Sequence, residues 1–175
     1  MEKEKEVLKI GFQMSKTKLH LKLFDESVHL NSLYILLKEF QIEVFKEEQT
    51  QLQIKNFIDS HTAGIYIVFS GTSAIGFTAF NKNEYFGLRK PTIANTYLYI
   101  KPKYRRTKAM HLISIQAGKV AIGHDCNLEH YYAKDSGSVK FIGRMKGELV
   151  YNAYEYPLEV VSSEIDELQK KVKVV

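Results

Sequence analysis

A cluster of basic residues stands in the middle of the chain, between two hydrophobic stretches of different period. Its five cations lie within eight residues and are Lys101, Lys103, Arg105, Arg106 and Lys108. Residues 97–100 alternate as in a strand, and helical spacing follows the cluster up to Gly123. The expected order is therefore a strand, a turn containing Pro102 and a helix. Because the first turn of a helix offers unpaired N–H groups and the positive end of its dipole, this pattern predicts an anion site, above all for phosphate.

The composition of the chain limits the class of protein. Its 175 residues, 45% hydrophobic and 26% charged, fit one folded domain and exclude fibrous and disordered classes. Cys126 is the only cysteine, so an intrachain disulfide is excluded and a reducing compartment is favoured. No apolar run reaches the roughly 18 residues of a membrane span, and the first residues lack the apolar core of a signal peptide. We therefore expect a cytoplasmic protein that does not cross a membrane.

The net charge of +5 raises the question of nucleic acid as a partner, because Lys and Arg release counterions when they bind phosphates. The 20 acidic residues lie among the 25 basic ones, however, so the excess is modest. Most of this charge is expected on a solvated surface. A basic nucleic-acid-binding module is therefore the third hypothesis only.

Hydrophobic spacing predicts the elements that hold the basic turn in place. Alternation and β-branched residues predict strands at residues 19–24, 65–69, 74–80, 92–100, 128–133 and 148–158. Helical spacing and cap residues predict helices at residues 28–46, 49–60 and 138–145, besides the helix that follows the basic turn. Residues 19–158 form the expected domain, between an arm or extra strand at 1–18 and a helix or tail at 159–175. The tail leaves a homodimer open.

This order of elements, with the basic turn at its centre, resembles the GCN5-related N-acetyltransferase (GNAT) family over residues 19–158. The sequence AIGF at residues 74–77 is similar to the family's glycine-bearing third strand. The sequence YIKPKYR at residues 99–105 is similar to the end of its fourth strand, before the coenzyme A loop. The resemblance implies an α/β (α+β) fold with a mixed, mostly antiparallel central sheet flanked by helices. It also implies acetyl transfer from acetyl-CoA to an amine, without a metal.

The family's coenzyme A loop has Gln or Arg, two residues, Gly, one residue, and then Gly or Ala. Arg105 fits the first position, whereas Lys108 and Met110 stand where small residues are expected. A lysine can still reach a phosphate with its side-chain charge. By this resemblance the cofactor-binding residues are Leu98, Tyr99, Ile100, Arg105, Arg106, Thr107, Lys108, Ala109, Met110 and His111.

The family's usual proton-transfer groups are not matched. Residues 95–96, Asn-Thr, stand where a carboxylate base is common on the fourth strand, and Phe141 stands where a tyrosine acid is usual. The candidate substitutes are Tyr97, His130 and Tyr132, with Glu129 and Tyr131 as further choices. Strand alternation puts even-numbered residues of 129–132 on one face and odd-numbered residues on the other, so only one pair faces the reacting carbonyl.

The missing groups keep a second hypothesis open, a noncatalytic member of the same fold that binds acyl-CoA or a partner protein. A metal site is not predicted, because the residues at 124–126 and His130 lack the paired spacing of zinc ligands. The amine acceptor is not predicted either, since residues 31–60 and 81–91 carry no transferable motif.

Overall fold

The computed structural model describes residues 18–46, 50–84, 90–131, 148–150, 153–156 and 158–173. Within these residues one seven-stranded sheet has the order β1-β2-β3-β4-β5-β7-β6. The strands are β1 (Leu19–Leu23), β2 (Gly64–Ser70), β3 (Ser73–Asn83), β4 (Thr92–Ile100), β5 (Asn127–Tyr131), β6 (Glu148–Val150) and β7 (Ala153–Tyr156). Every neighbouring pair is antiparallel except β4 and β5. The expected fold class, a mixed and mostly antiparallel sheet with flanking helices, is confirmed.

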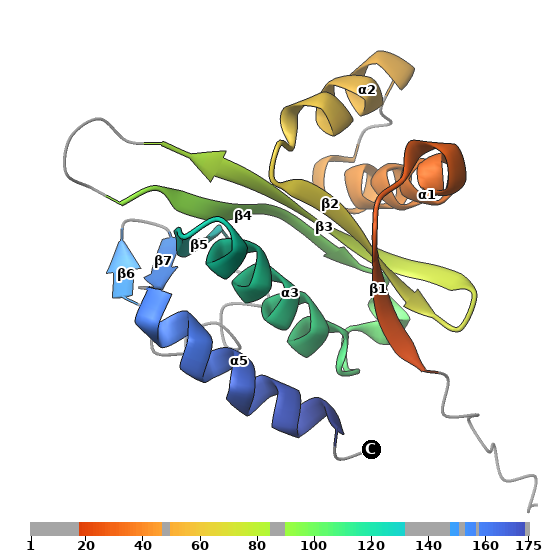
Figure 1. The fold of residues 1–175 in the computed structure, drawn as a ribbon. Coiled ribbons are helices and arrows are strands. Elements are labelled where there is room, and N and C mark those ends of the chain that lie inside the picture. Colours follow the sequence, from red (N-terminus) through yellow and green to blue (C-terminus); the bar gives the residue numbers. More distant parts are fainter. Residues whose placement is uncertain are drawn as a thin grey trace, which may run out of the picture.

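Helices cover both faces of the sheet (Figure 1). On one face lie α1 (Glu26–Phe45) and α2 (Gln51–Ser60), and on the other lie α3 (Ala109–Gly123) and α5 (Leu158–Lys173). The short 3-10 helix η1 (Pro102–Tyr104) joins β4 to α3. Separate hydrophobic clusters fill the layer between α1, α2 and the sheet and the layer between α3, α5 and the sheet. The sheet is therefore the middle of three layers, and β4 lies at its centre.

The two helices on the first face begin at side-chain caps. Asp25 is the N-cap of α1, and its carboxylate accepts a bond from the Ser27 N–H at 2.9 Å. Thr50 and Gln53 form a reciprocal capping box at the start of α2. These bonds fix where each helix starts, and thus which residues of α2 face the sheet.

The C-terminal part of the chain differs from the expectation. Residues 148–158 were expected to form one strand, but β6 and β7 are two short antiparallel strands with Val150 opposite Ala153. The aromatic and β-branched residues on both sides of residues 151–152 share one strand-like pattern, so the sequence alone does not separate the two strands. Helix α5 then begins at Leu158, one residue before the helix or tail expected at 159–175. The helix expected at 138–145 lies outside the described residues.

Helix α5 is packed tightly against α3. Its buried residues Val161, Ile165 and Leu168 belong to the same core cluster as Val120 of α3. The contact is close at Gly118, where an added Cβ would lie 2.5 Å from the Ile165 Cδ1. The last part of the chain is thus a helix with one face buried in the domain.

Candidate active site

Strands β4 and β5 separate at the centre of the sheet. Their parallel pairing runs from Thr92 opposite Asn127 to Asn95 opposite His130. Strand β4 continues for five more residues to Ile100 and stays paired with β3 on its other side. Along this second half, β5 provides no partner in the described part of the chain. This edge of β4, which is free among the described residues, leads directly into η1 and the start of α3.

A β-bulge marks the place where the two strands separate. Ala79 pairs with Tyr97 and Phe80 pairs with Asn95, so Thr96 is the extra residue of β4. Residues two apart on a regular strand share a face, but the bulge puts Asn95 and Tyr97 on opposite faces. Asn95 lies on the α3 side, whereas the Tyr97 ring lies on the α2 side, 5.2 Å from the ring of Phe57.

A buried polar chain joins three strands on the α3 side of this bulge. The Thr78 hydroxyl donates to the Asn95 Oδ1 at 3.0 Å, and the Asn95 amide donates to the His130 Nδ1 at 3.3 Å. The accepting Nδ1 places the His130 proton on Nε2. Burial lowers the pKa of His130 to about 4, so the ring is neutral at pH 7. The His130 side chain is thus buried on the α3 side of the sheet. It links β5 to β4 and β3 at the last position where β4 and β5 pair.

The first half of the basic turn is fastened to α1. The Arg105 Nε–H donates to the Ile100 carbonyl at 2.8 Å, and its guanidinium pairs with Glu43 at 2.6 Å. Lys101 pairs with Glu39 at 2.8 Å, and the Tyr99 hydroxyl donates to the same carboxylate at 3.4 Å. Burial, then the nearby Glu39 and Glu43 charges, raise the pKa of Tyr99 to about 12. Arg105, expected beside a phosphate, is therefore engaged with α1 and β4 in this structure.

The second half of the turn forms the start of α3. Thr107 Oγ1 accepts a bond from the Ala109 N–H at 3.3 Å, and Lys108 is the N-cap residue. The Lys108 ammonium donates to the Lys171 carbonyl of α5 at 2.6 Å. Met110 and His111 are in the first turn, where N–H groups have no acceptor within the helix.

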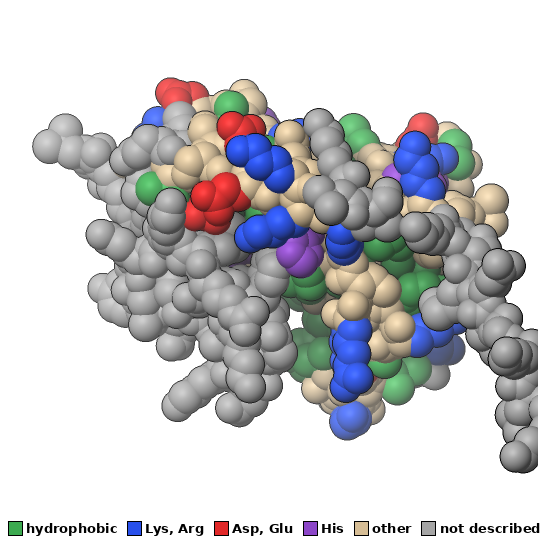
Figure 2. Space-filling view, turned by 90° about the horizontal axis from the view of Figure 1, so that it is seen from below, with side chains coloured by type: hydrophobic (Ala, Val, Ile, Leu, Met, Phe, Trp, Pro, Cys, Tyr) green, Lys and Arg blue, Asp and Glu red, His purple; other side chains and the backbone are tan. Residues whose placement is uncertain are grey.

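The surroundings of this helix start are positively charged. Burial, followed by the charges of Lys171 and Lys108, lowers the pKa of His111. Arg106 is exposed beside it. In Figure 2, several Lys and Arg side chains lie on the underside of the molecule, where Asp and Glu side chains are also present. The start of α3 thus combines the backbone N–H groups of a helix N-terminus with cations, which is the environment that a phosphate requires.

A groove of about 640 Å³ opens on the opposite side of the sheet, between α2 and strands β3 and β4. Its lining is polar and aromatic and consists of Gln53, Asn56, Phe57, Ser60, His61, Asn81, Thr96 and Tyr97. Thr96 and Tyr97 are the first two residues of β4 beyond its pairing with β5. The groove therefore reaches β4 where its free edge begins.

His61 is the groove residue that the sequence analysis missed. It was read only as the end of α2, because its partners are distant in sequence or belong to the main chain. In the structure its Nε2 lies 3.2 Å from the hydroxyl of Thr96, a residue set aside above because it is not a base. Of the candidates that were named, Tyr97 lines the groove, His130 lies on the other side of the sheet, and Tyr132 lies outside the described residues.

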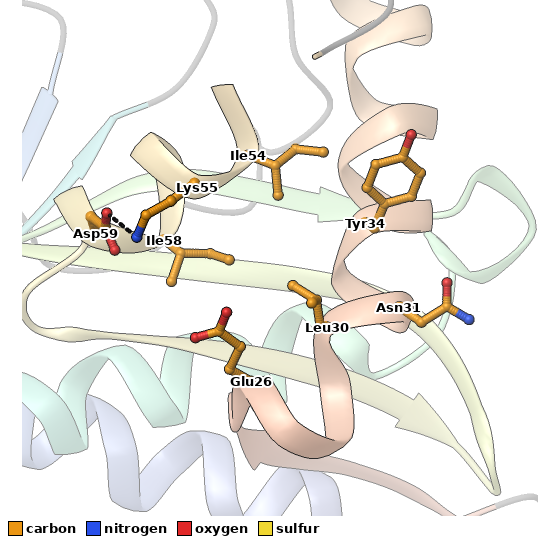
Figure 3. Close-up of a pocket in the computed structure, with 8 residues that line it drawn as sticks. All are labelled: Glu26, Leu30, Asn31, Tyr34, Ile54, Lys55, Ile58 and Asp59. Carbon is orange, nitrogen blue, oxygen red and sulfur yellow. Dashed lines mark hydrogen bonds and ion pairs between the residues drawn. The ribbon is translucent and has the colours of Figure 1, made fainter. Parts of the chain in front are cut away.

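A second hollow of about 510 Å³ lies between α1 and α2, away from β4 (Figure 3). Leu30, Ile54 and Ile58 point into it, and a Lys55–Asp59 ion pair of 3.0 Å stands at its rim. Because none of its lining residues belongs to β4, it is separate from the place where β4 and β5 diverge.

The described residues offer neither a metal-binding cluster nor a membrane-spanning helix. No group of three or more His, Cys, Asp or Glu in this part of the chain is arranged to hold a metal ion. Cys126 is buried and donates to the His124 carbonyl at 3.2 Å. No helix in the described ranges is both long and apolar enough to cross a membrane.

No protein-family model and no curated protein matches the sequence. Solved structures do match the fold. "A possible acetyltransferase" from Clostridium difficile 630 has a TM-score of 0.60 and 12% identity, covering 79% of this chain and 96% of that one. A GCN5-related N-acetyltransferase from Kribbella flavida has a TM-score of 0.56 and 14% identity, with 73% and 32% covered. Arabidopsis thaliana Naa50, solved with the bisubstrate analogue CoA-Ac-MVNAL, has a TM-score of 0.53 and 13% identity, with 78% and 95% covered. The chain has the fold of the GCN5-related N-acetyltransferases.

Proposed function

We propose that the protein is an N-acyltransferase that moves an acetyl group from acetyl-CoA to an amine. The observation that carries this proposal is the free edge of β4, which ends at the positively charged start of α3. An extended pantetheine chain presents amide groups that can bond to a strand edge, while its diphosphate suits a helix N-terminus. The two features lie consecutively along the chain, in the order in which one extended molecule would meet them.

In this proposal the donor contacts fall on two groups of residues. Main-chain groups of Leu98, Tyr99 and Ile100 bond to pantetheine and polarise the thioester carbonyl. The start of α3, from Thr107 to His111 and including Ala109 and Met110, lies at the diphosphate as a helix N-terminus, and Arg106 and Lys108 add positive charge. Arg105, expected beside a phosphate, also bonds to Ile100 and Glu43, and these bonds shape the turn. The bisubstrate analogue bound to Naa50 supports a CoA site in this fold, without extending to that protein's acceptor.

The reaction is a direct attack. The amine nitrogen forms a bond to the thioester carbon, the C–S bond breaks, and the thiolate leaves. The nitrogen loses one proton and the thiolate gains one, so the products are an amide and the CoA thiol. Asn95 and Thr96, at the usual place of the base, offer no carboxylate. A noncatalytic acyl-CoA-binding protein is therefore the second candidate.

Thermal unfolding with acetyl-CoA, CoA or an oligonucleotide separates these functions. A ligand at about 100 times its dissociation constant stabilises the native state by about 2.7 kcal/mol. Stabilisation by acetyl-CoA, together with thiol release in the presence of an amine from a broad panel, supports the transferase. Stabilisation without thiol release supports the binding protein. Stabilisation by the oligonucleotide alone contradicts both.

The position of the phosphates is tested by Arg106→Ala. Loss of one charge-assisted contact should weaken acetyl-CoA binding roughly tenfold in a titration. Lys90→Ala is the matched control, because Lys90 is paired with Asp125 beyond the far end of α3. Equal affinities of the two variants would place the phosphates elsewhere.

A further inference from the structure

We infer that His61, acting through the Thr96 hydroxyl, is the general base that takes the proton from the attacking amine. The inference rests on the proposed acyl transfer and adds the base that the sequence does not provide on β4. The position of Thr96 supports this role. Thr96 is the bulge residue at which β4 and β5 separate, and it also lines the groove beside α2. An amine in the groove therefore meets β4 where a donor along its free edge would place its thioester.

The hydrogen bonds of His61 fix which of its nitrogens is basic. The Nδ1 lies 2.5 Å from the Phe57 carbonyl, and a carbonyl only accepts, so this nitrogen carries the proton. In the neutral ring the lone pair is then on Nε2, 3.2 Å from the Thr96 Oγ1. The basic nitrogen thus points at the bulge hydroxyl without any rearrangement of the ring.

The surroundings keep this ring neutral and in place. His61 is only 7% exposed, and burial lowers its pKa, although the Phe57 carbonyl opposes this shift. Its ring packs 4.2 Å from that of Phe57 and 5.4 Å from that of Tyr97. Tyr97 is the other titratable residue of the groove, whose remaining lining side chains are amides, hydroxyls and a phenyl ring. A neutral imidazole with a fixed tautomer is the form that a general base needs at pH 7.

During the reaction the amine loses one proton and the thiolate gains one. As the amine nitrogen bonds to the carbonyl carbon, one of its protons passes to the Thr96 oxygen, and the hydroxyl proton passes to the His61 Nε2. The C–S bond breaks and the CoA thiolate takes a proton from water, while the imidazolium returns its proton to water. The Thr96 hydroxyl also lies 3.4 Å from the Ala79 carbonyl, so its one proton has two acceptors within reach. Thr96 is the relay and His61 is the proton acceptor.

His61→Gln tests the base, because an amide oxygen can accept from Thr96 but cannot hold a proton. We expect kcat at pH 7 to fall about 100-fold, which is at the lower end of the range for losing a general base. The affinity for acetyl-CoA should stay unchanged. The wild-type fall of kcat toward acid, as His61 becomes protonated, should be absent in the variant. Thr96→Val should lose activity similarly, whereas Thr96→Ser should retain it. His124→Gln, an exposed histidine at the end of α3, is the matched control.

The outcomes separate this inference from the proposed function. If wild type transfers acetyl groups and His61→Gln keeps both its kcat and the acid limb, the inference is wrong and the transferase stands. If wild type binds acetyl-CoA but acylates no amine, the proposed function itself is overturned, and the inference with it. A His61→Gln protein with a lowered Tm and lost acetyl-CoA binding would identify a structural role and also overturn the inference.

Discussion

His61 and His130 are both buried, neutral imidazoles near the same bulge, yet their surroundings differ. His130 is 3% exposed and belongs to a buried chain of hydrogen bonds between three strands on the α3 side. His61 lies on the α2 side in an open groove, and its basic nitrogen faces a hydroxyl. One extra residue in β4, Thr96, separates the two settings. Near the bulge, the α3 side of the sheet is therefore closely packed, whereas the α2 side leaves room for a reactant.

Overpacking α3 should have the largest effect on stability. Gly118→Leu places a side chain where Ile165 and Val161 already lie, and we expect the free energy of unfolding to fall by about 3 kcal/mol. Gly123→Leu is the matched control on the same helix, because a Cβ there meets nothing within 4 Å. Urea unfolding of both variants measures the difference. Equal stabilities would contradict a closely packed α3 side.

Acid should weaken the α3 side through His130. Its pKa is lowered from 6.5 to about 4. Between these two pH values the unfolded chain binds a proton at His130, whereas the native protein does not. Stability from this residue is present above pH 6.5 and is lost as the pH falls toward 4, by roughly 3 kcal/mol in total. His130→Leu should flatten this part of the pH dependence in urea unfolding, and His124→Gln should leave it unchanged. The same slope in all three proteins would exclude His130 as its source.

Breaking the polar chain should also weaken the sheet. Asn95→Leu leaves the Thr78 hydroxyl and the His130 Nδ1 without this partner, and we expect a loss of about 2 kcal/mol. On the open side, Asn56→Leu changes an exposed groove residue and should change the free energy of unfolding by less than about 0.5 kcal/mol. Denaturant titrations compare the two. A larger loss of stability in Asn56→Leu than in Asn95→Leu would contradict the proposed difference between the α2 and α3 sides of the sheet.

The ion pair at the basic turn should matter least for stability. Arg105 and Glu43 are both partly exposed, so Arg105→Ala should cost about 0.5 kcal/mol, and less in high salt. Its effect on acetyl-CoA affinity should be smaller than that of Arg106→Ala in the same titration. A larger loss of affinity in Arg105→Ala than in Arg106→Ala would place Arg105 at the phosphates, as the sequence suggested.

The sequence was sufficient for features that depend on local spacing. The alternation before Pro102 and the helical period after it predicted β4, the turn and α3 in the right order. The same reasoning was wrong for β6 and β7. These two strands share one strand-like pattern on either side of residues 151–152, so they were predicted as a single strand.

The details of the site were beyond the sequence because they depend on distant contacts. The bulge at Thr96 arises from register with β3, which the sequence of β4 does not specify. His61 meets a hydroxyl 35 residues away, and Arg105 meets a carboxylate 62 residues away. Neither pairing has a local signal, so the contact of Arg105 with α1 was not expected and His61 was overlooked.

The contact between Lys108 and Lys171 has a consequence for the order of folding during synthesis. The ammonium of Lys108 is held by a carbonyl made 63 residues later, and α3 packs on residues of the same late helix. At 5 to 20 residues per second, roughly, the ribosome needs several seconds to supply them. Until then the nascent chain exposes the apolar side of α3, and the turn proposed to hold the cofactor is among the last parts of the protein to reach its final form.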